Sequence, residues 1–335
     1  MDRSTDHDRG KWARRIFGVS SETEFEKLAL ELFRYQHKAN PLYREFCGLL
    51  GVDPLKVDHY REIPFLPVEF FRDHRVISGN PGSIGMVFTS SGTTGSLPSR
   101  HYVTDLSLYR ESFRKAFGLF YGDPSMYTIL ALLPGYLERP GSSLVFMMED
   151  LIGSGAEGSG FYLHEADRLE SALPGLHAAG RGIFLFGVSH ALLDFAMQHP
   201  VSIPGAIVME TGGMKGRKKE MVREELHSLI CRGLDVEKVH AEYGMTELLS
   251  QAYSQGSGLF RTPPWMRVLV RDVNDPLSLL SSQVTGGLNI IDLANLNSCA
   301  FIATQDLGRI HPDGSFEVLG RFDSSDIRGC SLLIS

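Results

Sequence analysis

A run of small hydroxylated residues and glycines is the part of this 335-residue sequence that is best suited to bind an anion. It comprises Thr89, Ser90, Ser91, Gly92, Thr93, Thr94 and Gly95. Because these residues carry almost no side-chain bulk, their backbone N–H groups and hydroxyls can turn toward one polyphosphate. The run lacks the lysine of a G-x-x-x-x-G-K-[ST] phosphate loop. A metal ion or distant residues must therefore neutralise the charge of the ligand.

The composition of this run is also typical of a flexible linker. The run nevertheless lies between an apolar, strand-like stretch at 84–88 and a helical pattern rich in aromatic residues at 106–120. That position favours an ordered loop inside a globular unit.

Three further segments combine charged residues with glycine turns. They are 240–247 (His-Ala-Glu-Tyr-Gly-Met-Thr-Glu), 304–309 (Thr-Gln-Asp-Leu-Gly-Arg) and 320–330, which contains Gly-Arg-Phe-Asp and ends on Cys330. Each segment alone is also typical of a solvated loop. Their order and spacing together with the hydroxyl-rich run carry the information.

In this order, the four segments resemble the core motifs of the adenylate-forming enzymes. Residues 89–99 are similar to the phosphate loop of that superfamily, and 243–247 are similar to its Y-G-x-T-E motif. Residues 304–309 resemble T-G-D-x-G-R, although Gln305 stands where the superfamily has glycine, and 320–323 resemble the hinge motif.

Within the superfamily, the chain resembles the acyl-protein synthetases of the bacterial fatty-acid reductase, the LuxE family. The supporting segments are 133–139, 210–217 and 327–330. The resemblance implies an α/β fold: the large domain of the adenylate-forming enzymes with a smaller β-rich C-terminal subdomain. Only twelve residues follow Asp323, so we expect the mobile C-terminal domain of the larger enzymes, with its catalytic lysine, to be absent.

The resemblance also implies a role for each polar residue near the phosphates of ATP. Ser91, Thr93 and Thr94 would hold the β- and γ-phosphates, and Thr246 would donate to the α-phosphate. Glu247 would hold Mg²⁺, which makes Thr246 and Glu247 catalytic residues. Without the motif, Glu247 would be interpreted as an exposed glutamate at the start of a helix.

A second set of implied roles concerns the nucleoside. Asp306 would accept hydrogen bonds from both ribose hydroxyls, a pairing to which a carboxylate is well suited. Arg321 would reach the ribose or the phosphate. Tyr243 would stack on adenine, with Gly212 and Gly213 close to its other face. The alternative for Tyr243 is a core tyrosine.

Cys330 is the predicted acyl acceptor. It follows Arg328 and Gly329, whose charge and small size would favour an accessible thiolate. The resembled family also passes its acyl group to a cysteine near the C-terminus. The alternative is a small buried hydrophobic residue, which is how we interpret Cys47, Cys231 and Cys299.

The bulk composition indicates an ordinary globular enzyme. Its hydrophobic fraction is 43% and its net charge is −7, which argues against a general nucleic-acid surface. The first 15 residues are polar and charged, so we expect no signal peptide. Apolar runs are too short to span a bilayer, and the four scattered cysteines suggest no disulfide framework. We therefore expect a cytoplasmic protein without a membrane span.

Three regions are predicted along the chain. Residues 1–83 form a helical and then extended region, 84–258 an α/β nucleotide-binding core, and 259–335 a β-rich subdomain with the hinge-like motif and the cysteine tail. Apolar periodicity predicts helices over 25–33 and 106–120.

Short apolar runs predict the strands of these regions. The runs at 84–88, 127–133, 183–186 and 206–209 alternate with helical stretches, which predicts a largely parallel sheet. Four more strands are expected near the C-terminus, at 267–270, 288–291, 300–304 and 315–319.

The sequence therefore predicts an ATP- and Mg²⁺-dependent enzyme that activates a carboxylic acid, most simply a fatty acid. It would transfer the acyl group to a protein thiol, with an acyl-accepting reductase or carrier protein as partner. The alternatives are an acyl- or aryl-CoA ligase resembling phenylacetate-CoA ligase and a non-catalytic module that binds nucleotide or presents an acyl group. A serine-hydrolase elbow at 187–191 lacks its final glycine, and Ser189 is expected to cap a helix instead.

Overall fold

The computed structural model describes residues 3–80, 84–90, 97–133, 141–162, 165–212 and 221–321, with side chains from residue 10 onward. These residues form two compact units. Unit 1 takes in 1–86, 99–105 and 264–335, and unit 2 takes in 87–98 and 106–263. Two chain boundaries, near 86 and 264, lie close to those predicted at 84 and 259. The first and third predicted regions, however, belong to the same compact unit.

Unit 2 is built on a six-stranded sheet in the order β5-β4-β6-β7-β8-β9. All neighbouring strands run parallel except β9, which is antiparallel to β8. The largely parallel sheet predicted from the apolar runs is confirmed. Its strands are β4 (Tyr127–Leu132), β5 (Gly160–Phe161), β6 (Gly182–Val188), β7 (Ile207–Thr211), β8 (Val239–Tyr243) and β9 (Ala252–Ser254).

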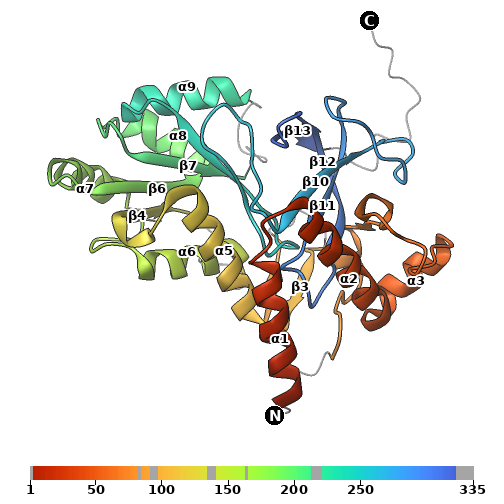
Figure 1. Cartoon of the computed structure of the whole chain (residues 1–335). Coiled ribbons are helices and arrows are strands. Elements are labelled where there is room, and N and C mark those ends of the chain that lie inside the picture. Colours follow the sequence, from red (N-terminus) through yellow and green to blue (C-terminus); the bar gives the residue numbers. More distant parts are fainter. Residues whose placement is uncertain are drawn as a thin grey trace, which may run out of the picture. The chain divides into compact units, whose positions relative to one another are not determined.

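Helices cover both faces of this sheet. Figure 1 shows α8 and α9 on one face, and α5 and α6 on the other. The predicted aromatic stripe of α5 packs inward, since Tyr109, Phe113 and Phe117 are all buried. The helices of unit 2 are α5 (Leu106–Tyr121), α6 (Ser143–Ser154), α7 (Ala166–Ala178), α8 (Ser189–Gln198) and α9 (Arg223–Leu234), with a short 3₁₀ helix η2 (Pro124–Met126).

Unit 1 contains a mixed five-stranded sheet. The order is β1-β12-β11-β10, with β13 paired to β12, and all pairs are antiparallel except β1 with β12. The four predicted C-terminal strands are present, but β12 continues six residues beyond the predicted stretch at 300–304, through the motif at 304–309. The strands are β1 (Leu66–Pro67), β10 (Met266–Arg271), β11 (Gly286–Asp292), β12 (Phe301–Ile310) and β13 (Phe316–Arg321).

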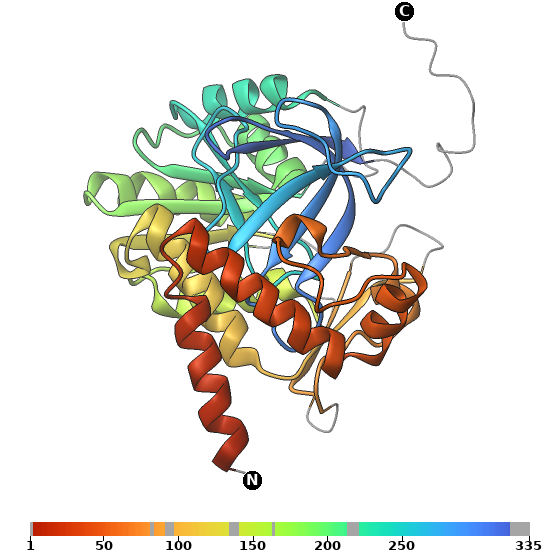
Figure 2. The same ribbon diagram turned by 45° about the vertical axis from the view of Figure 1, so that its right-hand side comes forward.

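The N-terminal helices pack onto this sheet, and Figure 2 shows α2 crossing in front of its strands. Gln36 fixes the contact because its amide donates to the Asn295 carbonyl (2.8 Å) and accepts from the Ala300 N–H (3.0 Å). The helices are α1 (Arg3–Ile16), α2 (Glu22–Ala39), α3 (Pro41–Leu49) and α4 (Phe70–Asp73), with a 3₁₀ helix η1 (Tyr60–Glu62).

The helix predicted over 25–33 lies within α2, which ends at Ala39, where the chain turns into α3. Asn40 caps α2 at its C-terminus, and its side chain accepts from the Tyr43 N–H (3.1 Å) to begin α3 at Pro41. Ser21 caps the start of α2 by accepting from the Glu24 N–H. A further helix, α3, therefore precedes the irregular part of this region.

The apolar stretch at 84–88 forms a strand, but not in the parallel sheet. Strand β2 (Met86–Thr89) forms a separate two-stranded sheet with β3 (Arg100–Val103). The apolar run correctly predicted a strand. Its partner, β3, lies about ten residues further along the chain, and the apolar pattern of the sequence does not reveal that pairing.

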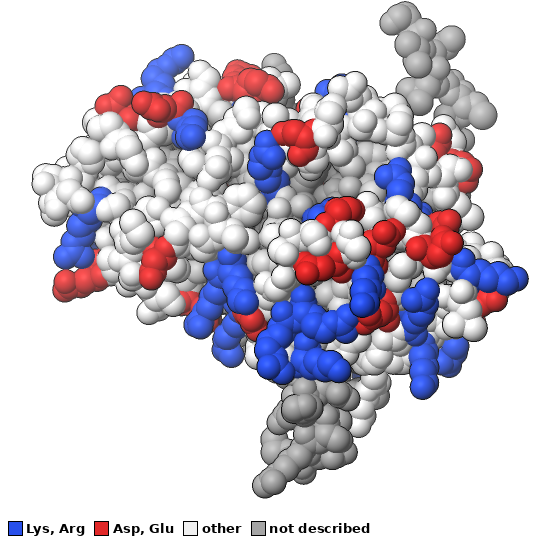
Figure 3. Space-filling view, viewed as in Figure 1, with Lys and Arg blue, Asp and Glu red and all other residues white. Residues whose placement is uncertain are grey.

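Charged side chains of both signs lie together on the surface. On the face drawn in Figure 3, Lys and Arg gather near α1 with acidic side chains beside them. Arg15 pairs with Glu31 (2.6 Å) and Arg267 pairs with Glu22 (3.0 Å). Within the described part of the chain, none of the helices has the length and apolar character that crossing a bilayer would require.

Close packing of α8 and α9 yields the first prediction. Gly233 lies against the backbone of Ala196, and a methyl group there would overlap the Ala196 carbonyl oxygen. We expect Gly233→Ala to lower the free energy of unfolding by about 1–3 kcal/mol, because backbone atoms must move apart. Gly118 in α5 has open space around it, so Gly118→Ala should raise stability by about 0.5–1 kcal/mol. Urea unfolding of both variants measures this; equal effects would contradict the packing.

Candidate active site

The carboxyl ends of β7 and β8 meet at one edge of the sheet in unit 2. Their register pairs Thr211 with Glu242, and the Thr211 hydroxyl donates to the Glu242 carboxylate. Gly212 follows with φ +70°, a left-handed conformation that glycine adopts without strain. In parallel α/β sheets, ligands bind outside the carboxyl ends of the strands. This edge is therefore the expected ligand side of unit 2.

A second carboxylate lies at the same edge, with α8 and α9 beside it. The Ser189 hydroxyl contacts the Glu210 carboxylate and the Gly212 carbonyl. His227 Nε2 and Arg223 Nε of α9 lie 3.6 and 3.9 Å from Glu210 Oε1. The prediction that Ser189 caps a helix is wrong, because α8 begins at Ser189 without a side-chain cap, and the hydroxyl holds the loop after β7 instead.

The loop after β8 carries the predicted Tyr-Gly-Met-Thr-Glu motif. Glu247 is only 5% exposed and lies in a turn, so the alternative of an exposed glutamate at a helix start is wrong. Thr246 is half-buried. Tyr243 is also half-buried, with its ring centroid 5.9 Å from that of Phe260. It is therefore not a fully buried core tyrosine.

Glu242, directly before this motif, has an unusual acidity. Burial raises its pKa to about 7, the Thr211 hydrogen bond opposes that rise, and the charge of Glu210 adds to it. A carboxyl group that titrates near neutrality in a water-excluded position is a common feature of functional sites.

The hydroxyl-rich run begins at the end of β2. The Thr89 N–H donates to the Gly141 carbonyl (2.8 Å), and a methyl group on Gly141 would press on Val87 O at 2.8 Å. Gly141 has φ +88°, so this close backbone approach requires glycine. Thr89 and Ser90 are half-buried. The predicted site residues Ser91, Gly92, Thr93, Thr94, Gly95, Gly213 and Cys330 lie outside the described residues.

Unit 1 brings together the two predicted nucleoside residues. Asp306 and Arg321 are register partners on β12 and β13, and Arg321 Nε lies 3.5 Å from Asp306 Oδ1. Gln305, which replaces the usual glycine, accepts from Arg321 Nη2 (3.2 Å) and donates to Glu69 Oε1 (2.7 Å). The replacement therefore adds side-chain contacts that hold Arg321 beside Asp306.

A buried arginine supports the strand that carries Asp306. Arg271 donates to the carbonyls of Leu288 (2.8 Å) and Thr304 and to the Asn289 side chain (2.9 Å). Burial lowers its pKa, while the charges of Glu69 and Asp306 raise it. A side chain on Gly287 would collide with the guanidinium. Glycine is therefore needed at that position.

The cysteines in the described residues are poor nucleophiles. Cys47 and Cys299 are fully buried, and burial raises the pKa of each thiol to about 12. Burial also raises the pKa of Cys231. Since the thiolate is the reactive species, their predicted role as packing residues agrees with the structure.

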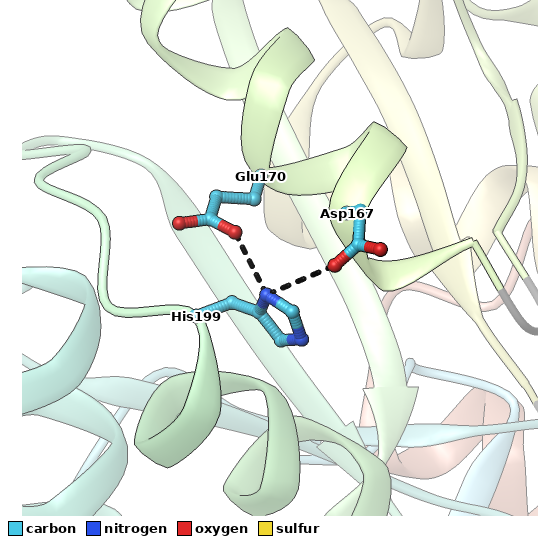
Figure 4. Close-up of side chains that lie close together, drawn as sticks. All are labelled: Asp167, Glu170 and His199. Atoms are coloured by element: carbon cyan, nitrogen blue, oxygen red, sulfur yellow. Dashed lines mark hydrogen bonds and ion pairs between the residues drawn. The ribbon is translucent and has the colours of Figure 1, made fainter.

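One surface group of potential metal ligands has a simpler explanation. Figure 4 shows Asp167 and Glu170 of α7 pointing at the same nitrogen of His199. His199 Nδ1 lies 2.7 Å from Glu170 Oε2 and 3.6 Å from Asp167 Oδ1. Since both carboxylates engage one ring nitrogen and Asp167 is highly exposed, the group is a salt bridge that holds the end of α8 to α7.

Several site residues escaped the sequence analysis. Glu242, Thr211 and Glu210 were noticed only as parts of motif segments and received no role. Arg271 and Gly141 gave no signal, because their partners are far away in the sequence. One indication of this site is present in the sequence: a glutamate near the end of each of two successive parallel strands, Glu210 in β7 and Glu242 in β8.

Comparison with known proteins identifies relatives along much of the chain. A family model described as "Acyl-protein synthetase, LuxE" matches residues 17–122. The long-chain-fatty-acid--luciferin-component ligase of Vibrio harveyi is 23% identical over 336 residues, covering 92% of this chain and 86% of its own. The protein of that name from Photorhabdus luminescens is 36% identical over 70 residues, 21% of this chain and 60% of its own.

Solved structures share the fold. A 2-hydroxyisobutyryl-CoA ligase in complex with 2-HIB-AMP and CoA has a TM-score of 0.65 at 12% identity, covering 90% of this chain and 70% of its own. ATP-bound MatB from Rhodopseudomonas palustris has a TM-score of 0.54 at 16% identity. That match covers 72% of this chain and about half (49%) of MatB.

The predicted α/β fold is thus confirmed, and it is the fold of these solved ligases. The chain is similar to the LuxE acyl-protein synthetases over residues 17–122, and to a long-chain-fatty-acid--luciferin-component ligase over most of its length. The resemblance that the four motifs predicted is confirmed.

The acidity of Glu242 yields a prediction about stability. Its pKa is about 7 in the folded protein against 4.5 for the ordinary group, so between these values the folded state binds more protons than the unfolded state. Stability should therefore fall as pH rises from about 4.5 to about 7, by about 3 kcal/mol from this group alone. Glu242→Gln should lack this loss, as urea unfolding at several pH values would show.

Glu237, which is exposed just before β8, provides the matched control. Glu237→Gln should follow the wild-type pH profile. Parallel profiles for wild type and Glu242→Gln would mean that Glu242 is not protonated in the folded protein near neutral pH.

Proposed function

We propose that this chain uses ATP to convert a long-chain fatty acid to its acyl-adenylate and then passes the acyl group to a protein thiol. The observation that carries the proposal is the loop after β8, which places a buried Glu247 and a half-exposed Tyr243 at the carboxyl end of a parallel sheet. The similarity to two ligases named for long-chain fatty acids supports the substrate class.

The first step joins two anions. A carboxylate oxygen of the acid attacks the α-phosphorus of ATP, the bond to the β-phosphate oxygen breaks, and pyrophosphate leaves. Because positioning and charge stabilisation dominate such transfers, donors near the α-phosphate matter most. We assign the Thr246 hydroxyl to an α-phosphate oxygen and the run Ser91–Gly95 to the outer phosphates.

Glu247 suits a magnesium ion because Mg²⁺ prefers oxygen ligands and is commonly held by one or two carboxylates plus substrate phosphates. The Glu247 side chain is only 5% exposed, so a cation that it binds would be largely shielded from water. Bound Mg²⁺ would supply charge neutralisation and polarise a phosphate oxygen.

Asp306 and Arg321 serve the nucleoside in this proposal. The Asp306 carboxylate is mostly buried, with an exposed fraction of 13%, and Arg321 is more exposed at 44%. Such a pair offers acceptors for two ribose hydroxyls and a cation for a phosphate oxygen. Tyr243 would stack on adenine, with Gly212 and Gly213 near the other face.

In the second step the Cys330 thiolate attacks the acyl carbonyl of the adenylate. A thioester bond forms, the mixed-anhydride bond breaks, and AMP leaves with the electron pair. A thioester conserves the activation for an acyl-accepting reductase or carrier protein. Buried Cys47 and Cys299 are unsuited to this role.

The direct test is exchange of labelled pyrophosphate into ATP, with Mg²⁺ and a series of carboxylic acids of increasing chain length. We expect exchange with long-chain acids. Glu247→Gln keeps the shape but removes the charge, so exchange should fall by about 100-fold, as for other lost preorganised electrostatic contacts. Asp306→Asn should mainly raise the KM for ATP.

The exposed Glu237→Gln variant should exchange at the wild-type rate. Normal ATP binding with no exchange for any acid would show that the chain is a non-catalytic nucleotide-binding module. Near-native kinetics in both active-site variants would mean that the motif roles are wrongly assigned.

The acceptor is tested by labelling with radioactive fatty acid. Cys330→Ser should retain pyrophosphate exchange but lose the label that hydroxylamine removes, because only the second step needs the thiol. Cys231→Ala, which alters a half-buried thiol, should keep the label. Full labelling of Cys330→Ser would place the acceptor elsewhere, and acyl-CoA formation on adding coenzyme A would favour a CoA ligase.

A further inference from the structure

The carboxyl group of Glu242 lies against Gly244, the first residue of the loop after β8. It is buried, with an exposed fraction of 7%, and it accepts the Thr211 hydroxyl. A methyl group on Gly244 would overlap Glu242 Oε1. Glycine therefore follows Tyr243 because the Glu242 carboxyl group occupies the space that a side chain would need.

The same carboxyl group also reaches the loop after β7. Thr211 is the last residue of β7, and Gly212 begins the loop. Ser189 contacts the Gly212 carbonyl, so hydrogen bonds fix this loop at two successive residues. One carboxyl group thus contacts the starts of two loops that are separated by about thirty residues of sequence.

Polar groups around Glu242 determine which protonation state the site favours. Burial raises the pKa of Tyr109 in α5 and of Tyr253 in β9, and the charge of Glu242 raises both further. Glu210 of β7 is the nearby negative charge. Burial and the like charge of Glu210 favour the neutral carboxylic acid, and they outweigh the Thr211 hydrogen bond, which favours the carboxylate.

We propose that Glu242 is a positioning residue of the nucleotide site, and that its neutral form holds the loops at Thr211-Gly212 and Tyr243-Gly244 in the arrangement that binds nucleotide. This inference rests on the proposed function, because that function assigns these two loops to adenine. Glu242 contacts neither the reacting atoms nor the nucleotide in this account. It acts through Thr211 and Gly244.

The charges near Glu242 determine whether nucleotide affinity rises or falls with pH. Ionising Glu242 places a second negative charge near Glu210, and an anionic nucleotide at the same sheet edge adds to that repulsion. Nucleotide affinity should therefore fall as pH rises above the titration of Glu242, which lies at about 7. One linked proton gives a limiting loss of about tenfold per pH unit.

Three proteins separate this role from simple packing. Glu242→Gln resembles the neutral acid, since its amide oxygen can still accept from Thr211. Glu242→Ala removes the acceptor altogether. The exposed Glu237→Gln serves as the matched control.

The experiment is calorimetric titration of each protein with Mg-ATP between pH 6 and 8.5, without fatty acid. We expect the ratio of wild-type Kd to Glu242→Gln Kd to rise with pH by about three- to tenfold, and this ratio cancels the titration of ATP itself. Glu242→Ala should bind weakly at every pH. A constant ratio would overturn the proposed role of the neutral form.

Hydrogen exchange without ligand tests the link between the loops independently. In Glu242→Ala, amide exchange should accelerate in both 209–212 and 243–248, whereas Glu242→Gln should match wild type. Acceleration throughout unit 2, or in one loop only, would overturn the positioning role. If wild-type protein binds no ATP at any pH, the proposed function fails, while this measurement still decides whether Glu242 joins the two loops.

Discussion

The site in unit 2 depends on hydrogen-bond donors for two buried carboxylates near the ends of parallel strands. Strands β7 and β8 each carry a glutamate as their second-to-last residue, Glu210 and Glu242, and their register places Thr211 against Glu242. A buried carboxylate without a donor would cost several kcal/mol. Thr211 supplies the donor for Glu242, and Ser189 supplies one for Glu210. The conformations of the two following loops depend on these pairings.

A comparable constraint operates in unit 1 around Arg271. Its guanidinium is buried among strands, where an unpaired cation would be unstable, and three acceptors on β11 and β12 satisfy it. Gly287 leaves the space that the guanidinium needs. Because Arg271 donates to the Thr304 carbonyl, it also fixes β12 two residues before Asp306. Thr304 then accepts from the Asp306 N–H (3.1 Å).

Local pattern and long-range pairing differ in how well the sequence reveals them. The helix at 106–121 follows from apolar periodicity, and strands β4, β6 and β7 follow from short apolar runs; both are properties of neighbouring residues. Strand β12 extends to Ile310 because β13 pairs with residues 306–310, and a polar, glycine-containing stretch does not signal that partner. The pairing of β2 with β3 escaped the sequence for the same reason.

The candidate site was predictable to the extent that motifs specify residue types at fixed spacing. Glu247, Asp306 and Arg321 could be selected in this way, whereas Glu242 resembled an ordinary strand residue until its burial was known. Gln305 illustrates the limit most clearly. Its sequence position marks a departure from the superfamily glycine, which suggests a weakened motif. The structure instead gives its side chain contacts to Glu69 and Arg321. The backbone freedom of glycine is thus replaced by side-chain hydrogen bonds that restrict Arg321, a compensation that only three-dimensional contacts reveal.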